Sequence, residues 1–538
     1  MKKYIISFVI FFSLTSFAQE GFYLLTTMSG DSVGDQFSVV SHIGDINADG
    51  FDDVIVGAPG GDYAKLFFGG VVFDTIPDLT FRDSKQLICY FGCAITGDGD
   101  INGDGYSDII IGASDTWIGP SFPYQIMTTG AAYVYFGGPA IDTTADLTLI
   151  VGDWFASTGW YYEFGTSVAI PGDLNGDGYD DFIIGAPNDD YDAHGRVYIY
   201  YGGPHLDDQY DVLLEGEEAF DNFGFSLSAI GDMNNDGFND LLIGAPMSNN
   251  NVPNKIYQGG KAYLVYGGNE INLNNTIEFI GDTSSYQYGR FISGLGDVNG
   301  DSINDLGIMG GEYFKIISGF DFYPALIVYA DTNYFGTYYS IASANDINSD
   351  GYNDILINLQ EAIYNEVSNN VFVFKGGEII DSIPDLEITS TENIGLLSSE
   401  YLGQINNGIS KDYIIGGYDW YGGNIPGLGK VYIYSFGLPD DVDEKYNQGY
   451  LTNYILSQNY PNPFNSSTLI KYSIPKQEQV TLKIYDLLGS FITTLVNEKK
   501  NVGEHQIEFQ TDKLSSGVYF YQLIAGSFIQ SKKMILLQ

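Results

Sequence analysis

Basic residues and cysteine are scarce in this chain. Of its 538 residues 22 are Lys or Arg, against 69 Asp or Glu, which gives a formal net charge of −47 at pH 7. A surface this negative repels phosphate backbones and anionic lipid headgroups, so nucleic-acid or anionic-membrane binding is excluded as the main function. Two cysteines in so long a chain also exclude a disulfide scaffold. Cys89 and Cys93 are either two inert thiols or, in an oxidising compartment, one local disulfide.

Histidine, on which many active sites depend, is also rare. The four histidines fall in different repeat positions or domains: His42, His194, His205 and His505. The sequence contains no Ser-His-Asp order, no His-Glu-x-x-His and no phosphate-binding glycine loop. We therefore expect a protein that is not an enzyme. An enzyme that uses only carboxylates, as in polysaccharide cleavage, remains the alternative.

Long apolar runs are missing except at the N-terminus. Lys2 and Lys3 precede an apolar run over residues 4–14, and small residues at Ser16 and Ala18 suit a signal peptidase. The run is shorter than the roughly 20 residues that a spanning helix needs. The sequence thus predicts a signal peptide over residues 1–18, no transmembrane helix after cleavage, and export through the periplasm.

Glycine, tyrosine and phenylalanine are plentiful, with 67, 43 and 35 residues in a chain that is 44% hydrophobic. This mixture is too apolar for a disordered chain and too rich in Gly and Tyr for a helical one. The composition therefore predicts an all-β fold.

One nine-residue phrase, Asp-x-Asn-x-Asp-Gly-x-x-Asp, recurs six times with one change, Ser for Gly in the fifth copy. We call the copies Asp loops 1 to 6; they occupy residues 45–53, 100–108, 173–181, 232–240, 297–305 and 346–354. A seventh, decayed copy holds Gln404, Asn406, Gly408 and Asp412 at the matching positions. Phe-Gly, Gly-Ala-Pro and Gly-Gly motifs and four short β-branched or aromatic runs accompany the repeats. Seven four-stranded repeats predict a seven-bladed β-propeller over residues 19–437.

The two ends of this region complement each other. The last repeat stops after residues 431–436 without a fourth strand, whereas residues 22–27 read as a fourth strand that lacks its first three. Pairing the two ends would close the ring and remove the exposed strand edges that an open stack would leave. We therefore expect closure.

Each Asp loop offers hard oxygen ligands to a cation. Side chains at positions 1, 3, 5 and 9 converge, the carbonyl at position 7 adds an oxygen, and Gly at position 6 permits the turn. An EF-hand would carry Glu at position 12, where this chain has apolar strand residues. Metal-free Asx turns are the alternative, but six copies of three clustered carboxylates would repel one another without a divalent ion. We predict about six structural calcium ions, with these ligands: Asp45, Asn47, Asp49, Phe51, Asp53, Asp100, Asn102, Asp104, Tyr106, Asp108, Asp173, Asn175, Asp177, Tyr179, Asp181, Asp232, Asn234, Asp236, Phe238, Asp240, Asp297, Asn299, Asp301, Ile303, Asp305, Asp346, Asn348, Asp350, Tyr352 and Asp354.

Two copies depart from the pattern. Ser302 replaces Gly at position 6 of Asp loop 5, at a cost of about 1 kcal/mol if that residue needs a positive φ. The seventh copy lacks the carboxylates at positions 1 and 5. We expect a weaker site in loop 5 and no ion in the seventh copy.

The combined Phe-Gly, Asp-loop, Gly-Ala-Pro and Gly-Gly series resembles the FG-GAP repeats of integrin α-subunit propellers and their bacterial relatives. The resemblance covers roughly residues 20–437. It implies extracellular adhesion or ligand binding, with calcium in a structural role, although propellers host many functions.

The tail differs in charge from the rest of the chain. Residues 451–538 hold eight Lys and six Asp or Glu, and residues 438–450 read as a linker. Strand-like runs predict a small β-sandwich. The order Tyr-Pro-Asn-Pro-Phe (460–464), Lys-Ile-Tyr-Asp-Leu-Leu-Gly (483–489) and Lys-Lys-Met-Ile-Leu (532–536) resembles the type A sorting domain of the type IX secretion system. That resemblance implies passage to the outer surface or medium through this machinery.

All four tryptophans are assigned to loops on the face opposite the Asp loops: Trp117, Trp154, Trp160 and Trp420. Such aromatics either pack their own loops or anchor a ligand, because exposed Trp is favoured at interfaces. We predict a secreted or cell-surface adhesion or ligand-binding module whose partner is an extracellular protein or glycan.

Overall fold

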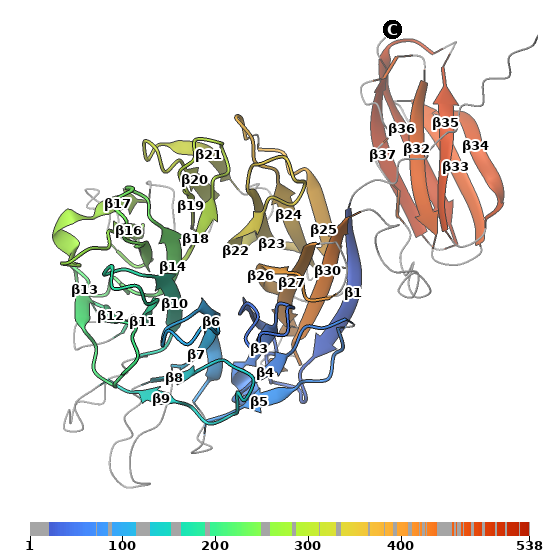
Figure 1. The fold of residues 1–538 in the computed structure, drawn as a ribbon. Helices are drawn as coiled ribbons and strands as arrows, with labels where there is room; N and C mark the ends of the chain where they lie inside the picture. Colours follow the sequence, from blue (N-terminus) through green and yellow to red (C-terminus); the bar gives the residue numbers. More distant parts are fainter. Residues whose placement is uncertain are drawn as a thin grey trace, which may run out of the picture. The chain divides into compact units, whose positions relative to one another are not determined.

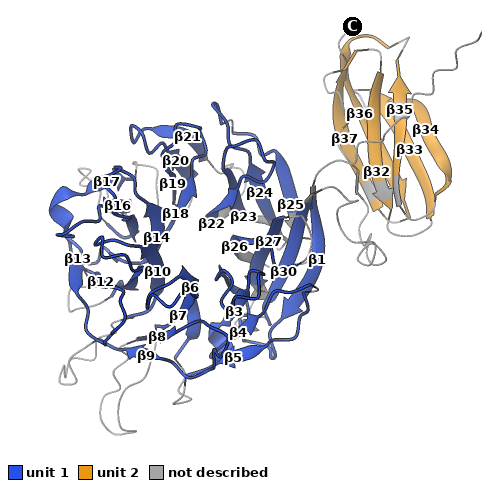
Figure 2. Cartoon of the chain, viewed as in Figure 1, with its two compact units in different colours: residues 1–441 blue, residues 442–538 orange. Residues whose placement is uncertain are grey.

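The computed structural model describes residues 21–437 and 455–536, apart from residues 72, 84–88, 115–129, 152–162, 189–193, 249–258, 282–286, 311–312, 330–334, 364–365, 381, 391–394, 407–410, 419, 422–424, 427, 457–458, 460–463, 466, 475–477, 487–489, 501–502, 512–513 and 527. The chain divides into two compact units, residues 1–441 and 442–538 (Figure 2). The expected signal peptide and the whole of the expected linker lie outside the described residues.

The first unit contains seven four-stranded antiparallel sheets arranged as the blades of a propeller, which confirms the predicted fold (Figure 1). Blades 1 to 3 are β2 (Val39–His42), β3 (Val54–Ala58), β4 (Tyr63–Phe67) and β5 (Leu79–Phe81); β6 (Phe91–Gly99), β7 (Asp108–Ala113), β8 (Ala131–Tyr135) and β9 (Leu147–Leu149); and β10 (Ser167–Gly172), β11 (Asp181–Ala186), β12 (Arg196–Tyr200) and β13 (Val212–Glu215).

Blades 4 to 6 are β14 (Ser226–Gly231), β15 (Asp240–Ala245), β16 (Lys261–Val265) and β17 (Ile277–Ile280); β18 (Phe291–Gly296), β19 (Asp305–Met309), β20 (Tyr313–Ile317) and β21 (Pro324–Tyr329); and β22 (Phe335–Asn345), β23 (Asp354–Ile363), β24 (Glu366–Phe374) and β25 (Leu386–Ser390). Two 3-10 turns, η1 (Pro59–Gly61) and η2 (Leu273–Asn275), lie in loops of blades 1 and 4.

Blade 7 closes the ring as predicted. It combines β26 (Gly395–Gly403), β27 (Lys411–Tyr418) and β30 (Lys430–Gly437) with β1 (Gly21–Ser29) from the N-terminal end. β1 runs antiparallel to β30, with Phe22 opposite Phe436. The small hairpin β28 (Trp420–Tyr421) and β29 (Ile425–Pro426) lies between β27 and β30. The first blade is therefore held to the last by the chain itself, because β1, the outermost strand of blade 7, leads along the chain to β2 of blade 1.

The core of the propeller lies between the blades. The second strands of blades 1 to 5 are buried at every residue, because they are short Val- and Ile-rich runs that face apolar neighbours on both sides. A separate cluster of buried apolar side chains joins each pair of neighbouring blades. One of these clusters packs Val40 and Val54 of blade 1 against Ile414 and Val431 of blade 7. Apolar burial thus continues across the seam.

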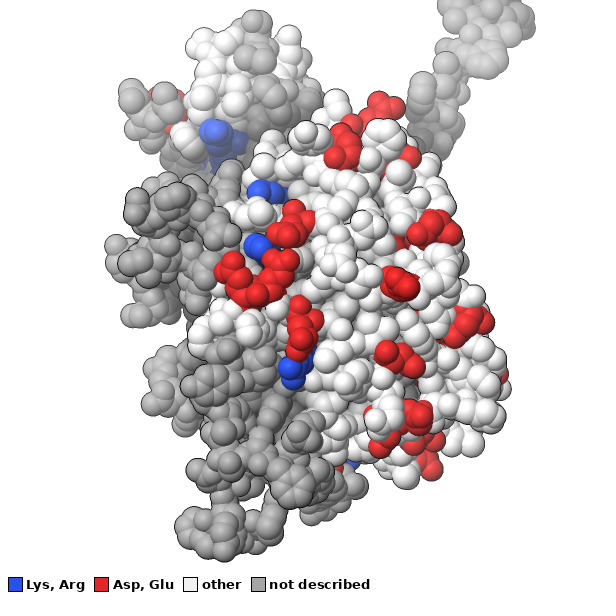
Figure 3. Space-filling model, turned by 90° about the vertical axis from the view of Figure 1, so that its left-hand side faces the viewer, with Lys and Arg blue, Asp and Glu red and all other residues white. Residues whose placement is uncertain are grey.

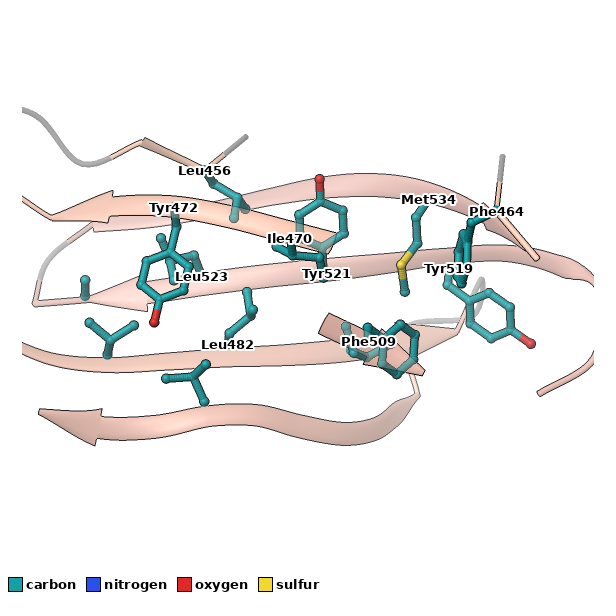
Figure 4. Packing of buried hydrophobic residues seen from close by; sticks show 14 of the residues in the cluster. Leu456, Phe464, Ile470, Tyr472, Leu482, Phe509, Tyr519, Tyr521, Leu523 and Met534 are labelled. Atoms are coloured by element: carbon teal, nitrogen blue, oxygen red, sulfur yellow. The ribbon is translucent and has the colours of Figure 1, made fainter. Parts of the chain in front are cut away.

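The second unit consists of two sheets that share one core. One sheet contains β31 (Ile455–Leu456), β32 (Ser467–Ile474) and β35 (Gly503–Gln510); the other contains β34 (Phe491–Lys500), β33 (Glu478–Asp486), β36 (Gly517–Ala525) and β37 (Phe528–Leu536). Apolar residues alternate along the strands, as in β33, where Val480, Leu482 and Ile484 are buried. Figure 4 shows side chains from both sheets gathered in one layer.

Candidate calcium-binding loops

The Asp loops join the first and second strands of their blades, as the sequence predicts, and the loop backbone is held by its own side chains. In Asp loop 1 the Asp45 carboxylate accepts hydrogen bonds from the N–H groups of Asp49 (3.0 Å) and Gly50 (2.7 Å). Asp49 in turn accepts from the N–H of Phe51 (3.0 Å). The bond from position 6 to the Asp at position 1 recurs in all six loops.

The Asp at position 9 has a different environment. It has no exposed surface in any of the six loops: Asp53, Asp108, Asp181, Asp240, Asp305 and Asp354. One carboxylate oxygen accepts from the N–H at position 2 of its own loop. The other accepts from the N–H of the glycine that follows the third strand of the blade. This aspartate therefore ties the loop to the third strand of its blade.

Burial, with repulsion by neighbouring loop carboxylates, raises the pKa of these position-9 aspartates. The pKa is about 7 in Asp loops 1 to 3 and about 6 in Asp loops 4 to 6. A divalent cation bound to the loop would remove both penalties on the charged form.

The oxygen ligands of the Asp loops fit a hard cation, although their side chains do not converge on one metal position in this structure. Among the described residues no group of three or more His, Cys, Asp or Glu side chains is already arranged around a common metal position. Part of the reason is that the carboxylates are turned onto backbone N–H groups. Oδ2 of the position-1 aspartate accepts one such bond in each loop and keeps a second lone pair. Carboxylate, amide and carbonyl oxygens are the ligands that Ca²⁺ takes. The residues present therefore suit calcium.

Position 6 adopts a positive φ in every Asp loop. The φ is 91° to 94° at the five glycines and 70° at Ser302. A Cβ atom at Gly50, Gly105, Gly178, Gly237 or Gly351 would meet no heavy atom within 4 Å. Ser302 therefore carries the backbone strain that its position implies, without a steric clash.

The seventh copy keeps only part of the pattern. Gly408 lies outside the described residues, but Asp412 is fully buried and accepts a hydrogen bond from Nδ2 of Asn406 (3.1 Å). Lys411 beside it donates to the backbone carbonyl of Asp346 and to Oγ of Ser349 (3.3 Å), both in Asp loop 6. The position-9 aspartate thus remains in a copy that has lost two ligand carboxylates.

Bonds between successive loops were not foreseen from the sequence. In Asp loops 1, 3, 4 and 6 the N–H at position 8 donates to the carbonyl at position 1 of the preceding copy, as from Asn239 to Asp173 (2.9 Å) and from Asp52 to Gln404 (3.1 Å). The second glycine of each Gly-Gly pair donates to the preceding loop at position 2, as from Gly203 to Ile101 (2.8 Å). The recurrent Gly-Gly pair was the sequence signal that could have predicted these contacts between loops. Glycine is required there because a Cβ at Gly202 would clash with two backbone carbonyl oxygens.

The opposite face is described only in part. Trp117, Trp154 and Trp160 lie outside the described residues, and of Trp420 only the backbone is described, paired with Pro426 in the β28–β29 hairpin. Whether the structure brings the four tryptophans together therefore stays a prediction. Cys89 and Cys93 are free thiols, the first buried and the second half-buried, so no disulfide joins them.

Comparison with known protein families identifies repeats within the propeller. The FG-GAP repeat family matches residues 40–73, 164–200 and 223–265. The chain carries integrin-α-like FG-GAP repeats. Integrin alpha-5 of Xenopus laevis is 30% identical over 210 residues, which is 38% of this chain and 19% of the relative. Integrin alpha-8 of Mus musculus is 32% identical over the same coverage, and integrin alpha-PS2 of Drosophila melanogaster is 30% identical over 235 residues, 41% of this chain and 16% of the relative. The matches span less than a fifth of those integrins.

The tail matches a second family, the secretion system C-terminal sorting domain, over residues 458–537. The FG-GAP propeller is therefore exported by the type IX system to the outer surface or the medium. No helix among the described residues is long and apolar enough to cross a membrane. The surface of the exported protein is strongly acidic: on the side drawn in Figure 3, Asp and Glu are scattered widely and Lys and Arg form only a few small patches.

Proposed function

We propose that this protein is a secreted or cell-surface adhesion module whose FG-GAP propeller is stabilised by six calcium ions, one in each of Asp loops 1 to 6. The observation that carries the proposal is the recurrence of one oxygen-lined loop in six blades of an integrin-like ring. The sorting domain supports it, because it delivers the propeller to the space where adhesion occurs. The seventh copy, which lacks two ligand carboxylates, is left without an ion.

The ligand is an extracellular protein or glycan, bound on the face opposite the Asp loops. In blades 1 to 6 calcium acts from the side opposite the ligand, by holding the loop that joins the first and second strands of the blade. We propose binding and not catalysis, since the sequence offers none of the common catalytic motifs. A polysaccharide-cleaving enzyme would need a carboxylate pair near the aromatic loops.

A binding array tests this function. The purified propeller is applied to glycans and matrix proteins with and without calcium. Trp117→Ala and Trp420→Ala are compared with Phe320→Ala, which removes an aromatic side chain that is 71% exposed in the loop between β20 and β21, on the Asp-loop face. We expect the Trp variants to lose binding and the Phe320 variant to keep it. Equal binding by all three, or turnover of a polysaccharide, would contradict the proposal.

A further inference from the structure

A cluster of charged side chains from three blades surrounds His42 at the seam of the ring. His42 is the last residue of β2, and its backbone N–H donates to Oε2 of Glu400 in β26 of blade 7 (2.6 Å). Nδ1 of its ring lies 3.6 Å from Oδ2 of Asp98 in β6 of blade 2. Nε2 lies 3.8 Å from Oδ1 of Asp52, in the loop that follows β2 in blade 1. One imidazole therefore faces carboxylates of blades 1, 2 and 7.

The spacing of this cluster suits ion pairing more than hydrogen bonding. Both ring nitrogens are too far from their carboxylates for a direct hydrogen bond, and Nε2 is buried without a hydrogen-bond partner in the described part of the chain. Beyond the three carboxylates, Asp180 adds negative charge near Asp98. Asp412 does the same near Asp52. A proton on His42 is the one positive charge that the titrating side chains of this cluster can supply.

The electrostatics favour protons on His42 and Glu400. Burial by itself lowers the pKa of His42, but the surrounding carboxylates outweigh it and the net shift is upward. Burial raises the pKa of Glu400 to about 7. Both groups thus bind protons more tightly in the folded chain than in the unfolded one.

We propose that His42 and Glu400 are the titrating groups of a proton-operated latch that ties blade 1 to blades 7 and 2. The latch holds most tightly when His42 and Glu400 are protonated and Asp98 and Asp52 remain charged partners of the imidazolium. The sign follows from linkage. The contribution of His42 is complete below its ordinary pKa of about 6.5 and is lost as pH rises above that value. Glu400 works in the same direction, because charging its carboxylate as pH rises toward and above 7 costs more in the folded chain. The seam should therefore weaken between pH 6 and 8.

Urea unfolding of the full chain at pH 6, 7 and 8 tests the latch, always in excess calcium so that the Asp loops stay loaded. For each proton that His42 and Glu400 release, the unfolding constant of the unmodified protein should rise by up to about tenfold per pH unit. His42→Gln and Glu400→Gln should each flatten this rise. His205→Gln, which changes an exposed histidine in blade 3, is the matched control and should keep the original profile.

Hydrogen exchange shows whether the effect is local to the seam. After correction for the intrinsic pH dependence, peptides from β2 and β26 should lose protection at pH 8 in the unmodified protein, while β14 of blade 4 should not. An unchanged pH profile in His42→Gln, or an equal flattening in His205→Gln, would overturn the proposal. If His42→Gln does not fold, Glu400→Gln, which mimics the protonated acid, decides it by the same criteria.

Discussion

Exchange of one exposed carboxylate for an amide in Asp loop 3 should show how much of the stability of the folded chain depends on bound calcium and how much on hydrogen bonds within the loop. Asp177, at position 5, is exposed, and its oxygens accept hydrogen bonds from the N–H of Tyr179 (3.1 Å) and from Nδ2 of Asn175 (2.9 Å). Asp177→Asn keeps one carbonyl oxygen for the bond from Tyr179 and removes the charge. Without calcium the change should therefore be nearly neutral, whereas with calcium it should abolish or weaken one site.

The size of the effect follows from mass action. A site filled at a calcium concentration about 100-fold above its Kd stabilises the folded state by about 2.7 kcal/mol. An unfolding entropy of about 2.1 cal/mol/K per residue over roughly 420 residues means that 1 kcal/mol shifts Tm by about 1 °C. Asp177→Asn should thus lower Tm by about 3 °C in calcium, and removal of calcium from all six loops by about 18 °C.

Calorimetry in calcium and in excess chelator measures both effects, and Asp181→Asn is the matched control. The carboxylate of Asp181 is buried and accepts from the N–H groups of Leu174 and Gly202, each at 2.8 Å. Its replacement should cost about 3 kcal/mol even in chelator, because a buried N–H loses its acceptor. In calcium the cost should be larger, since Asp181 is also a predicted ligand. An equal loss of Tm by Asp177→Asn in chelator, or identical melting of the unmodified protein in both buffers, would refute the calcium assignment.

Three further predictions concern the weakest loop, the tail and the ligand face. Ser302→Gly should stabilise Asp loop 5 by about 1 kcal/mol through relief of strain, and Gly351→Ser should destabilise loop 6 by the same amount. A destabilising Ser302→Gly or a stabilising Gly351→Ser in denaturant titrations would contradict the strain argument. Deletion of residues 451–538 should leave the propeller folded but retained in the periplasm, which fractionation of a type IX-competent cell measures; normal surface delivery would be the contrary result. Trp160→Ala should weaken ligand binding by about 2 kcal/mol if that side chain is an anchor, with calcium-dependent melting unchanged; early melting with normal affinity would show that it packs its loop.

Much of the propeller could be predicted because the sequence features that specify it, short strand-forming runs and turn residues, are local and recur in every repeat. Short Val- and Ile-rich runs between turn residues specify strands, and a seven-fold recurrence specifies the number of blades. Closure was predictable for a related reason: β1 and the end of β30 are complementary fragments of one repeat, and their pairing of Phe22 with Phe436 follows from that. No long-range contact had to be guessed beyond this one.

The contacts between blades could not be read in the same way. The sequence shows that Gly202 and Gly203 recur, but not that one donates to the buried carboxylate of Asp181 and the other to Ile101 of the preceding blade. The charge cluster around His42 was also missed, because its members come from β2, β6 and β26, which are far apart in the chain. A lone histidine in one repeat carries no periodic signal, so only the closed ring reveals its carboxylate neighbours.

The seventh blade separates two roles of aspartate, support of the blade and ligation of an ion, that the repeat pattern alone does not separate. Asp412 is buried like the position-9 residue of every other blade, although Gln404 and Gly408 have replaced the acids at positions 1 and 5. If the position-9 carboxylate served only as a metal ligand, nothing would hold it in a copy without a site, since burial raises the pKa of Asp412 to about 7 and so opposes its charge. Its place at the start of β27 indicates that a position-9 aspartate supports the blade even where no ion is predicted. We propose that the acids at positions 1 and 5, in contrast, are needed only where an ion binds. The number of calcium ions should therefore follow the paired acids at positions 1 and 5, which six loops have and the seventh lacks.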